Sequence, residues 1–179
     1  MTLIEILIGL ALMAVVLLMV GYGYRAVVKG NVEVNNTAEM QSIVKAAGHQ
    51  LEGDLKRAGF GMGGGAAFST MKGSEIALNF LDLPGATCAQ GEPVSIHYSI
   101  SHNAIVRELA CNGKPKPSKA TEGGRDTLDM RFRYLDNTGN TAATSDKVRT
   151  VEYTIEVRAG MGTKKSRAST GSVSIVNNG

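Results

Sequence analysis

Residues 1–24 read MTLIEILIGLALMAVVLLMVGYGY, and Glu5 is the only charged side chain among them. About 17–25 apolar residues are enough for a helix that crosses a lipid bilayer. A carboxylate in such a helix costs on the order of 2.5–3.5 kcal/mol at mid-bilayer, so an intramembrane acid normally serves a function and has a partner. The stretch therefore predicts a membrane-spanning helix. We expect its Glu5 either to sit at the headgroup level or to pair with an amine of a neighbouring subunit.

The helical pattern continues beyond residue 24 and becomes amphipathic. Apolar residues recur at helical spacing on one face: Met40, Ile43, Val44, Ala47, Leu51, Leu55 and Ala58. We expect the helix to end at Gly59, because a glycine after the last turn followed by the glycine-rich residues 60–65 cannot extend it. A helix of about 55 residues would be about 80 Å long.

Three glycines weaken this predicted helix. Gly21, Gly23 and Gly30 each cost about 1 kcal/mol relative to alanine in a helix interior, and an asparagine-rich patch follows at residues 35–37. We predict that any segment unwound on assembly lies between Gly21 and Asn36.

Apolar and polar residues alternate after Glu75, which is the pattern of half-buried strands. The clearest alternation covers residues 128–134 and 151–158. Residues 94–101 and 104–109 are typical of a tight hairpin closed by His102-Asn103, and residues 172–176 are expected to form a last edge strand. Loops are expected at residues 87–93, 113–124, 137–146 and 160–169.

The apolar faces of the helix and the sheet most simply cover each other. The sequence thus predicts an α+β fold in which a long N-terminal helix packs on an antiparallel β-sheet. The expected segments are an apolar helix (residues 1–24), its amphipathic continuation (25–58), a glycine-rich connector (59–74) and a β head domain (75–179). With 22 glycines and no tryptophan in 179 residues, we expect a light core and many turns.

The N-terminus resembles that of a known family. Thr2-Leu3-Ile4-Glu5 followed by an unbroken apolar helix is similar to the mature N-terminus of type IV pilins and of the pseudopilins of type II secretion. The resemblance implies removal of a short basic leader by a prepilin peptidase, N-methylation of Met1, and pairing of Glu5 with the Met1 amine of a neighbour. Met1, Thr2 and Glu5 are the expected assembly residues. The chain departs from the family in having Met1 where phenylalanine is usual, and Gly21-Tyr22-Gly23 where many pilins carry a proline.

Two later stretches narrow the resemblance. The first stretch is Asp54-Leu55-Lys56-Arg57-Ala58-Gly59-Phe60. The second is Ile96-His97-Tyr98-Ser99-Ile100, which leads to Ile105-Val106-Arg107-Glu108. Both are similar to PilW-type minor pilins and J-type minor pseudopilins. The family's disulfide usually closes a loop near the C-terminus, whereas the two cysteines here lie in mid-domain.

Cys88 and Cys111 are the only cysteines in the chain. In an exported protein an even count indicates a disulfide, with a reduced pair as the alternative. Metal binding is not expected, since no further cysteine or histidine lies at a metal-binding spacing from them. Closing this loop would stabilise the fold by roughly 3 kcal/mol.

The resemblance implies a non-enzymatic structural subunit of a type IV pilus or related filament, without a cofactor. It also implies that the subunit waits in the inner membrane. A platform protein and a cytoplasmic assembly ATPase would then add it to copies of itself or to other pilins. The product would be a surface filament or a periplasmic pseudopilus.

Three alternatives stay open. The chain could be a minor pilin or pseudopilin that primes or caps a filament. It could be an adhesive or DNA-binding pilin that uses Lys114, Lys116, Lys119, Lys164 and Lys165. It could also be a membrane-anchored enzyme, although no catalytic constellation stands out in the sequence.

Overall fold

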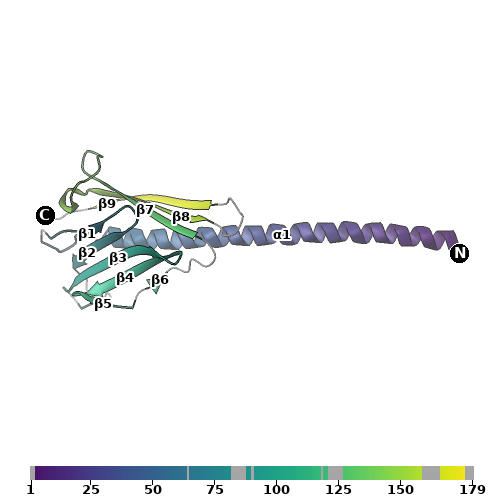
Figure 1. Cartoon of the computed structure of the whole chain (residues 1–179), viewed down its shortest axis with the longest axis horizontal. Helices are drawn as coiled ribbons and strands as arrows, with labels where there is room; N and C mark the ends of the chain where they lie inside the picture. Colours follow the sequence, from purple (N-terminus) through teal and green to yellow (C-terminus); the bar gives the residue numbers. More distant parts are fainter. Residues whose placement is uncertain are drawn as a thin grey trace. The chain divides into compact units, whose positions relative to one another are not determined.

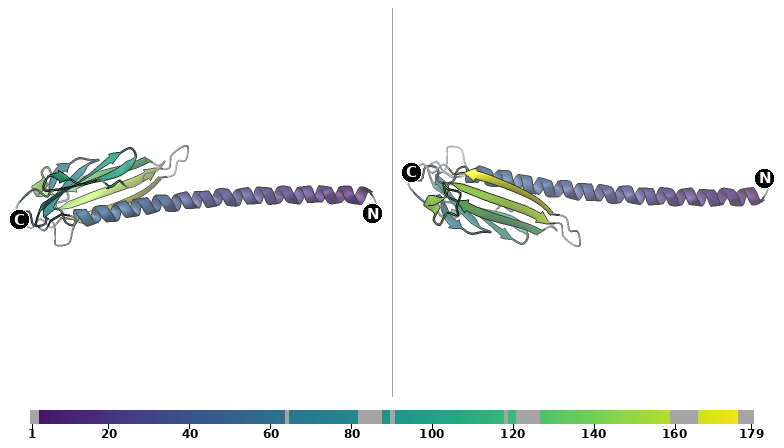
Figure 2. Two further views of the ribbon diagram at one scale, coloured as in Figure 1. Left: turned by 90° about the horizontal axis from the view of Figure 1, so that it is seen from below. Right: turned by 90° about the horizontal axis from the view of Figure 1, so that it is seen from above.

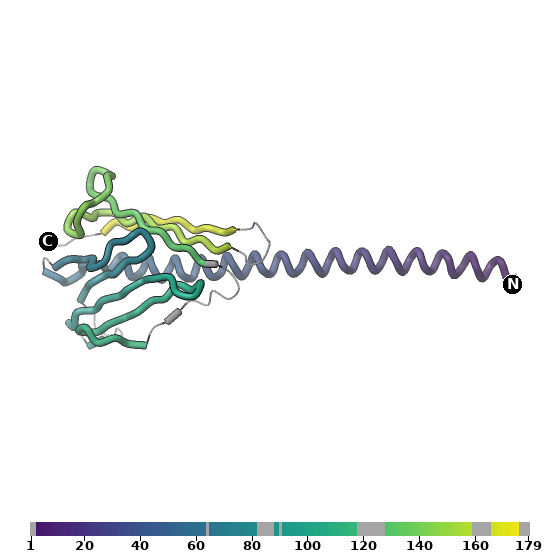
Figure 3. The backbone as a smooth tube through the Cα atoms, in the orientation of Figure 1, coloured from purple at the N-terminus to yellow at the C-terminus, as the bar shows by residue number. Residues whose placement is uncertain are grey.

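A computed structural model describes residues 3–63, 65–81, 88–89, 91–117, 119–120, 127–158 and 166–175 (Figure 1). The chain divides into two compact units, Met1–Glu39 and Met40–Gly179. Helix α1 (Leu3–Leu55) forms the described part of the first unit and begins the second. The tube in Figure 3 traces the chain from this helix into the strands.

The second unit contains two antiparallel sheets (Figure 2). The first is six-stranded, in the order β1-β2-β3-β4-β5 with β6 also paired to β4, and the second has the order β7-β8-β9. The strands are β1 (Phe68–Met71), β2 (Ile76–Leu81), β3 (Pro93–Ser101), β4 (Ala104–Cys111), β5 (Lys114–Pro115), β6 (Lys119–Ala120), β7 (Thr127–Leu135), β8 (Thr150–Arg158) and β9 (Ser166–Ser174). A 3-10 turn, η1 (Ser145–Lys147), precedes β8.

The end of α1 belongs to the core of this second unit. Its buried apolar residues follow helical spacing: Met40, Val44, Ala47, Leu51 and Leu55. They join one apolar cluster with residues from both sheets, including Ile96 of β3 and Ile155 of β8. Full burial of a leucine contributes about 1.5–3 kcal/mol. The predicted α+β fold, a long helix packed on antiparallel sheet, is confirmed.

The helix ends earlier than predicted. Its last residue is Leu55, whereas the sequence predicts an end at Gly59. The N–H groups of Arg57 and Ala58 donate to the carbonyls of Asp54 and Leu55, three residues back, so the last turn tightens. Gly59 then adopts φ 80°, a conformation that favours glycine, and its N–H donates to Asn79 of β2.

The hairpin of β3 and β4 is confirmed in position and register. Ser101 pairs with Ala104, and the two residues between them have positive φ, 50° at His102 and 61° at Asn103. A two-residue hairpin turn of type I′ requires positive φ at both positions. Asparagine tolerates this conformation, and it closes the turn here.

The sequence prediction missed several strands. β1 lies inside the expected connector, β5 and β6 lie inside the expected loop 113–124, and β9 begins at Ser166, inside the expected loop 160–169. The division into two sheets was also not predicted. β1, β5 and β6 are too short to show alternation, and β9 consists mainly of small polar residues held by its main-chain pairing with β8.

The turn between β1 and β2 connects the two sheets. The N–H of Phe132 on β7 donates to the carbonyl of Gly73, and the hydroxyl of Tyr134 donates to the carbonyls of Lys72 and Glu75. Burial raises the pKa of the Tyr134 phenol well above its usual value. Neutral tyrosine therefore holds the second sheet to the first.

Candidate functional site

The first unit exposes apolar side chains on all sides of α1. Every residue from 3 to 36 is exposed, and large apolar side chains range from 42 % exposed at Val28 to 77 % at Leu3. The helix is long and apolar enough to cross a membrane. Soluble proteins rarely expose such extended apolar surface, and contact with lipid or with other protein would remove it from water.

Glu5 lies in the first turn of α1. Met1 and Thr2 fall outside the described residues, so the assembly residues are seen only at Glu5. Gly21, Gly23 and Gly30 are all helical, and an added Cβ at each would meet no atom within 4 Å. The chain by itself is thus helical through residues 21–36; unwinding on assembly stays a prediction.

A buried carboxylate holds the end of α1 to the first sheet. Asp54 accepts a hydrogen bond of 2.5 Å from the Tyr98 hydroxyl on β3. It also accepts two from Arg107 on β4, 2.7 Å from Nε and 3.3 Å from the second guanidinium nitrogen. Asp54 is 6 % exposed. The three side chains form a charge-assisted network across three elements.

This network also shifts the pKa values of Tyr98 and Arg107. Burial, then the negative charge of Asp54 and its hydrogen bond, raise the pKa of the Tyr98 phenol far above its usual value. Burial alone would lower the pKa of Arg107, but the hydrogen bond and charge of Asp54 outweigh it and raise that pKa. Tyr98 is therefore a neutral donor and Arg107 a permanent cation.

A second contact holds α1 to the other sheet. The Tyr153 hydroxyl on β8 donates to Glu52 at 2.6 Å. Burial, followed by Glu52, raises the pKa of this phenol. The ring lies against Gly171, its partner on β9, where an added Cβ would collide with the ring carbons and the hydroxyl. Glycine at 171 thus leaves the space that the ring occupies.

We expect Gly171→Ala to lower the free energy of unfolding by about 1–3 kcal/mol, because the methyl group displaces the Tyr153 ring. Gly73→Ala, in the turn between β1 and β2, is the control, since its added Cβ would meet nothing within 4 Å. Chemical unfolding of both variants measures the difference. Equal stability of the two would show that the ring does not depend on the glycine.

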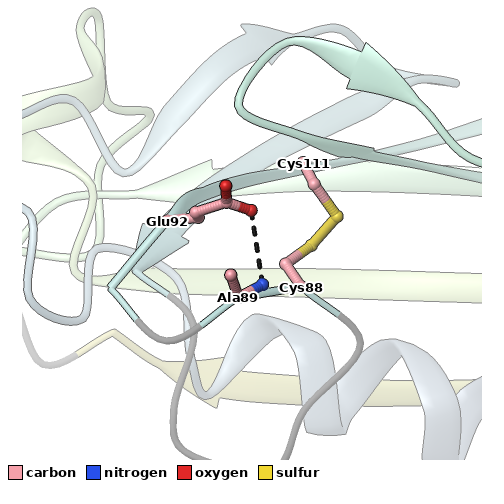
Figure 4. Close-up of a disulfide and its surroundings, with 4 residues drawn as sticks. All are labelled: Cys88, Ala89, Glu92 and Cys111. Atoms are coloured by element: carbon pink, nitrogen blue, oxygen red, sulfur yellow. Dashed lines mark hydrogen bonds between the residues drawn. A yellow bond between two sulfur atoms is a disulfide. The ribbon is translucent and has the colours of Figure 1, made fainter.

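The predicted disulfide is present. Cys88 is bonded to Cys111 at the end of β4, with Cα atoms 5.7 Å apart (Figure 4). The next residue, Ala89, donates its N–H to Glu92 at 3.3 Å. Cys111 is buried and Cys88 packs against the apolar core. The bridge attaches the chain segment before β3 to the far strand of the hairpin.

The predicted surface lysines are only partly described. Lys114 lies on β5 and Lys116 just beyond it, and both are exposed. Lys119 is placed by its backbone alone, in β6. Lys164 and Lys165 lie outside the described residues. Within the described ranges, no cluster of three or more His, Cys, Asp or Glu side chains could hold a metal ion.

Comparison with solved structures finds the same architecture in a type IV-like pilin from Thermus thermophilus. The match has a TM-score of 0.58 and covers 79 % of this chain and 97 % of that chain, with 14 % sequence identity. This chain has the type IV pilin fold. Comparison of the sequence with protein-family models and with curated proteins finds no match.

The fold brings two distant stretches of the sequence together. Asp54 lies in residues 54–60, and Tyr98 and Arg107 lie in residues 96–108. Sequence reasoning did not connect them. The available signal was an acid at position 54 between Leu51 and Leu55, on the apolar face of the helix, since a charge there requires a partner.

Proposed function

We propose that this chain is a structural subunit of a type IV pilus or related filament. The observation that carries the proposal is the first unit: an apolar helix with its side chains exposed all round, which continues into the core of a pilin-fold head. The helix would lie in the inner membrane first and among the helices of other subunits later. Either surrounding shelters its apolar surface, which is worth about 25 cal/mol per Å².

Transfer between these two surroundings would require outside work. Lipid and filament core both shelter the same apolar side chains, so burial alone gives little net drive for extraction. We propose that a cytoplasmic assembly ATPase, acting through a platform protein, supplies this work. A prepilin peptidase would act earlier, and the amine of Met1 would be methylated.

Glu5 would align one subunit on the next. A carboxylate among apolar helices is costly, and the terminal amine of a neighbouring Met1 would offset that cost at one position only. Glu5 lies in the first helical turn, close in sequence to this terminus. The pairing would then determine how far one helix is displaced along another.

The test is Glu5→Gln in cells that make the filaments. We expect far fewer filaments with unchanged or improved membrane insertion, because glutamine keeps the shape of the side chain and loses its charge. Filament counts and the amount of subunit in the membrane fraction measure the two effects. Glu39→Gln, an exposed acid beyond the apolar stretch, is the matched control. Normal filament numbers in the Glu5 variant would refute the pairing.

A minor pilin or pseudopilin that primes or caps the filament is the second candidate. Support comes from the sequence alone, in residues 54–60 and 96–108, which resemble PilW-type and J-type proteins. Subunit stoichiometry in purified filaments separates the roles. A major subunit would account for most of the mass, and a priming subunit for a few copies.

A further inference from the structure

Among the residues that the structure describes, strand β9 presents a long edge without the usual protection. Its nine residues pair in continuous register with β8 and it ends the second sheet. Residues 166–174 contain no proline, and Arg167 is their only charged residue. Ser166, Ala168, Thr170, Ser172 and Ser174 are all exposed. Natural proteins usually shield such an edge with charges, prolines or bulges, because it can pair with another strand.

The other described edge strands are protected. β7, at the opposite edge of the second sheet, carries Asp129, Arg131 and Arg133, and the N–H of its Phe132 donates to the carbonyl of Gly73. β5 and β6, beside β4, have two residues each and carry Lys114, Pro115 and Lys119. β1 has an irregular register. Beyond β1, the edge of β2 is covered by residues 59–60: the N–H of Gly59 donates to the carbonyl of Asn79, and the N–H of Leu81 donates to the carbonyl of Phe60. The contrast sets β9 apart within the described residues.

The register shows which backbone groups of β9 point outward. The N–H of Ile175 donates to the carbonyl of Arg149 at 2.7 Å, and the pairing continues in step along the strand. In an antiparallel pair, hydrogen-bonded and non-hydrogen-bonded positions alternate. Positions 167, 169, 171 and 173 therefore bond to β8. Positions 166, 168, 170, 172 and 174 direct their N–H and C=O groups away from it.

We propose that the outward edge of β9 binds the same edge of a second copy of this chain, antiparallel and centred on Thr170. This register places Ser166 opposite Ser174, Ala168 opposite Ser172, and Thr170 opposite its own counterpart. Small polar pairs of this kind are favourable across strands. Arg167 meets Val173, so no like charges lie opposite each other.

Pairing along one edge gives a weak dimer. Nine residues a side bury less area than the roughly 1,200 Å² of a stable interface, so cross-linking should rise with protein concentration. The interface uses only the head domain. It is independent of the proposed role in filaments and of Glu5.

Variants that each add one cysteine to the full-length chain, with the Cys88–Cys111 bridge kept, test the geometry in detergent micelles. In the proposed dimer, Cα atoms at position 170 lie about 5.5 Å apart, within the range for a disulfide. We expect Thr170→Cys to give an oxidised dimer on a non-reducing gel. Thr154→Cys is the matched control, because Thr154 faces Thr170 from β8. Its two copies would be about 14 Å apart across three strand spacings, too far to bond.

A second pair of variants blocks the edge. Ala168→Pro removes an outward N–H that β8 does not use, so we expect T170C cross-linking to fall about tenfold or more. Ala168→Val keeps the N–H and should keep the dimer. If the proline variant does not fold, sedimentation equilibrium can compare the dimerisation of Thr170→Lys with that of Thr170→Val. We expect the lysine variant to dimerise less, since like charges directly opposite each other destabilise a strand pair. Equal cross-linking by T154C and T170C, no T170C dimer, or a dimer that survives both edge blocks would overturn the proposal.

Discussion

Replacing Asp54 by alanine should lower the free energy of unfolding by about 3–5 kcal/mol, the usual cost of removing one partner of a buried ion pair. The side chain of Arg107 is only 18 % exposed, and the Tyr98 hydroxyl is buried with Asp54 as its acceptor. Without the carboxylate, the guanidinium loses its counter-charge and the phenol loses its acceptor. Denaturant unfolding of the full-length chain in detergent measures the loss.

Two further variants separate charge from shape at this site. Asp54→Asn keeps the size and one acceptor oxygen, so we expect a smaller loss than for alanine. Asp54→Leu combined with Arg107→Met replaces the pair by apolar groups and should recover most of the stability. If the free energy of unfolding of Asp54→Ala lies within 1 kcal/mol of that of the original chain, the network does not hold α1 to the first sheet.

Loss of the Cys88–Cys111 bridge should be the next largest effect, about 3 kcal/mol in the chain-entropy model. The bridge closes a loop with a sequence separation of 23 that contains β3 and most of β4. Without it, the unfolded chain gains the freedom that the loop closure removed. Unfolding of a Cys88→Ala, Cys111→Ala double variant measures the change.

Filament assembly by the same double variant serves as a control. The bridge lies in the head, far in sequence from Glu5, so each folded subunit should still enter filaments and only subunit abundance should fall. Reduction of the original chain should reproduce the loss of stability. A reduced chain as stable as the oxidised one would contradict the prediction.

Some elements could be predicted because their signals are local. The exposed apolar helix follows from residues 1–24, and the β3–β4 hairpin from two alternating runs around His102-Asn103. β7 and β8 follow from the alternation over residues 128–134 and 151–158. In the strands, the alternation of neighbouring side chains already indicates which face is buried.

Other elements could not be predicted because their partners are distant. β9 has almost no apolar alternation, and its main-chain bonds to β8 make it a strand. β1 has four residues and an irregular register. The helix ends at Leu55 because its last turn tightens and the N–H of Gly59 donates to the carbonyl of Asn79 on β2. Local propensity cannot report such contacts.

The sequence by itself determined the apolar helix, its single acid, the α+β architecture and the cysteine pair, since composition and period carry this information. Only the tertiary structure decided that Asp54 meets Tyr98 and Arg107, that Tyr153 requires Gly171, and that β9 ends the second sheet among the described strands. The physical reason is sequence separation. A buried charge or a ring needs a complementary neighbour, and folding alone brings that neighbour from tens of residues away.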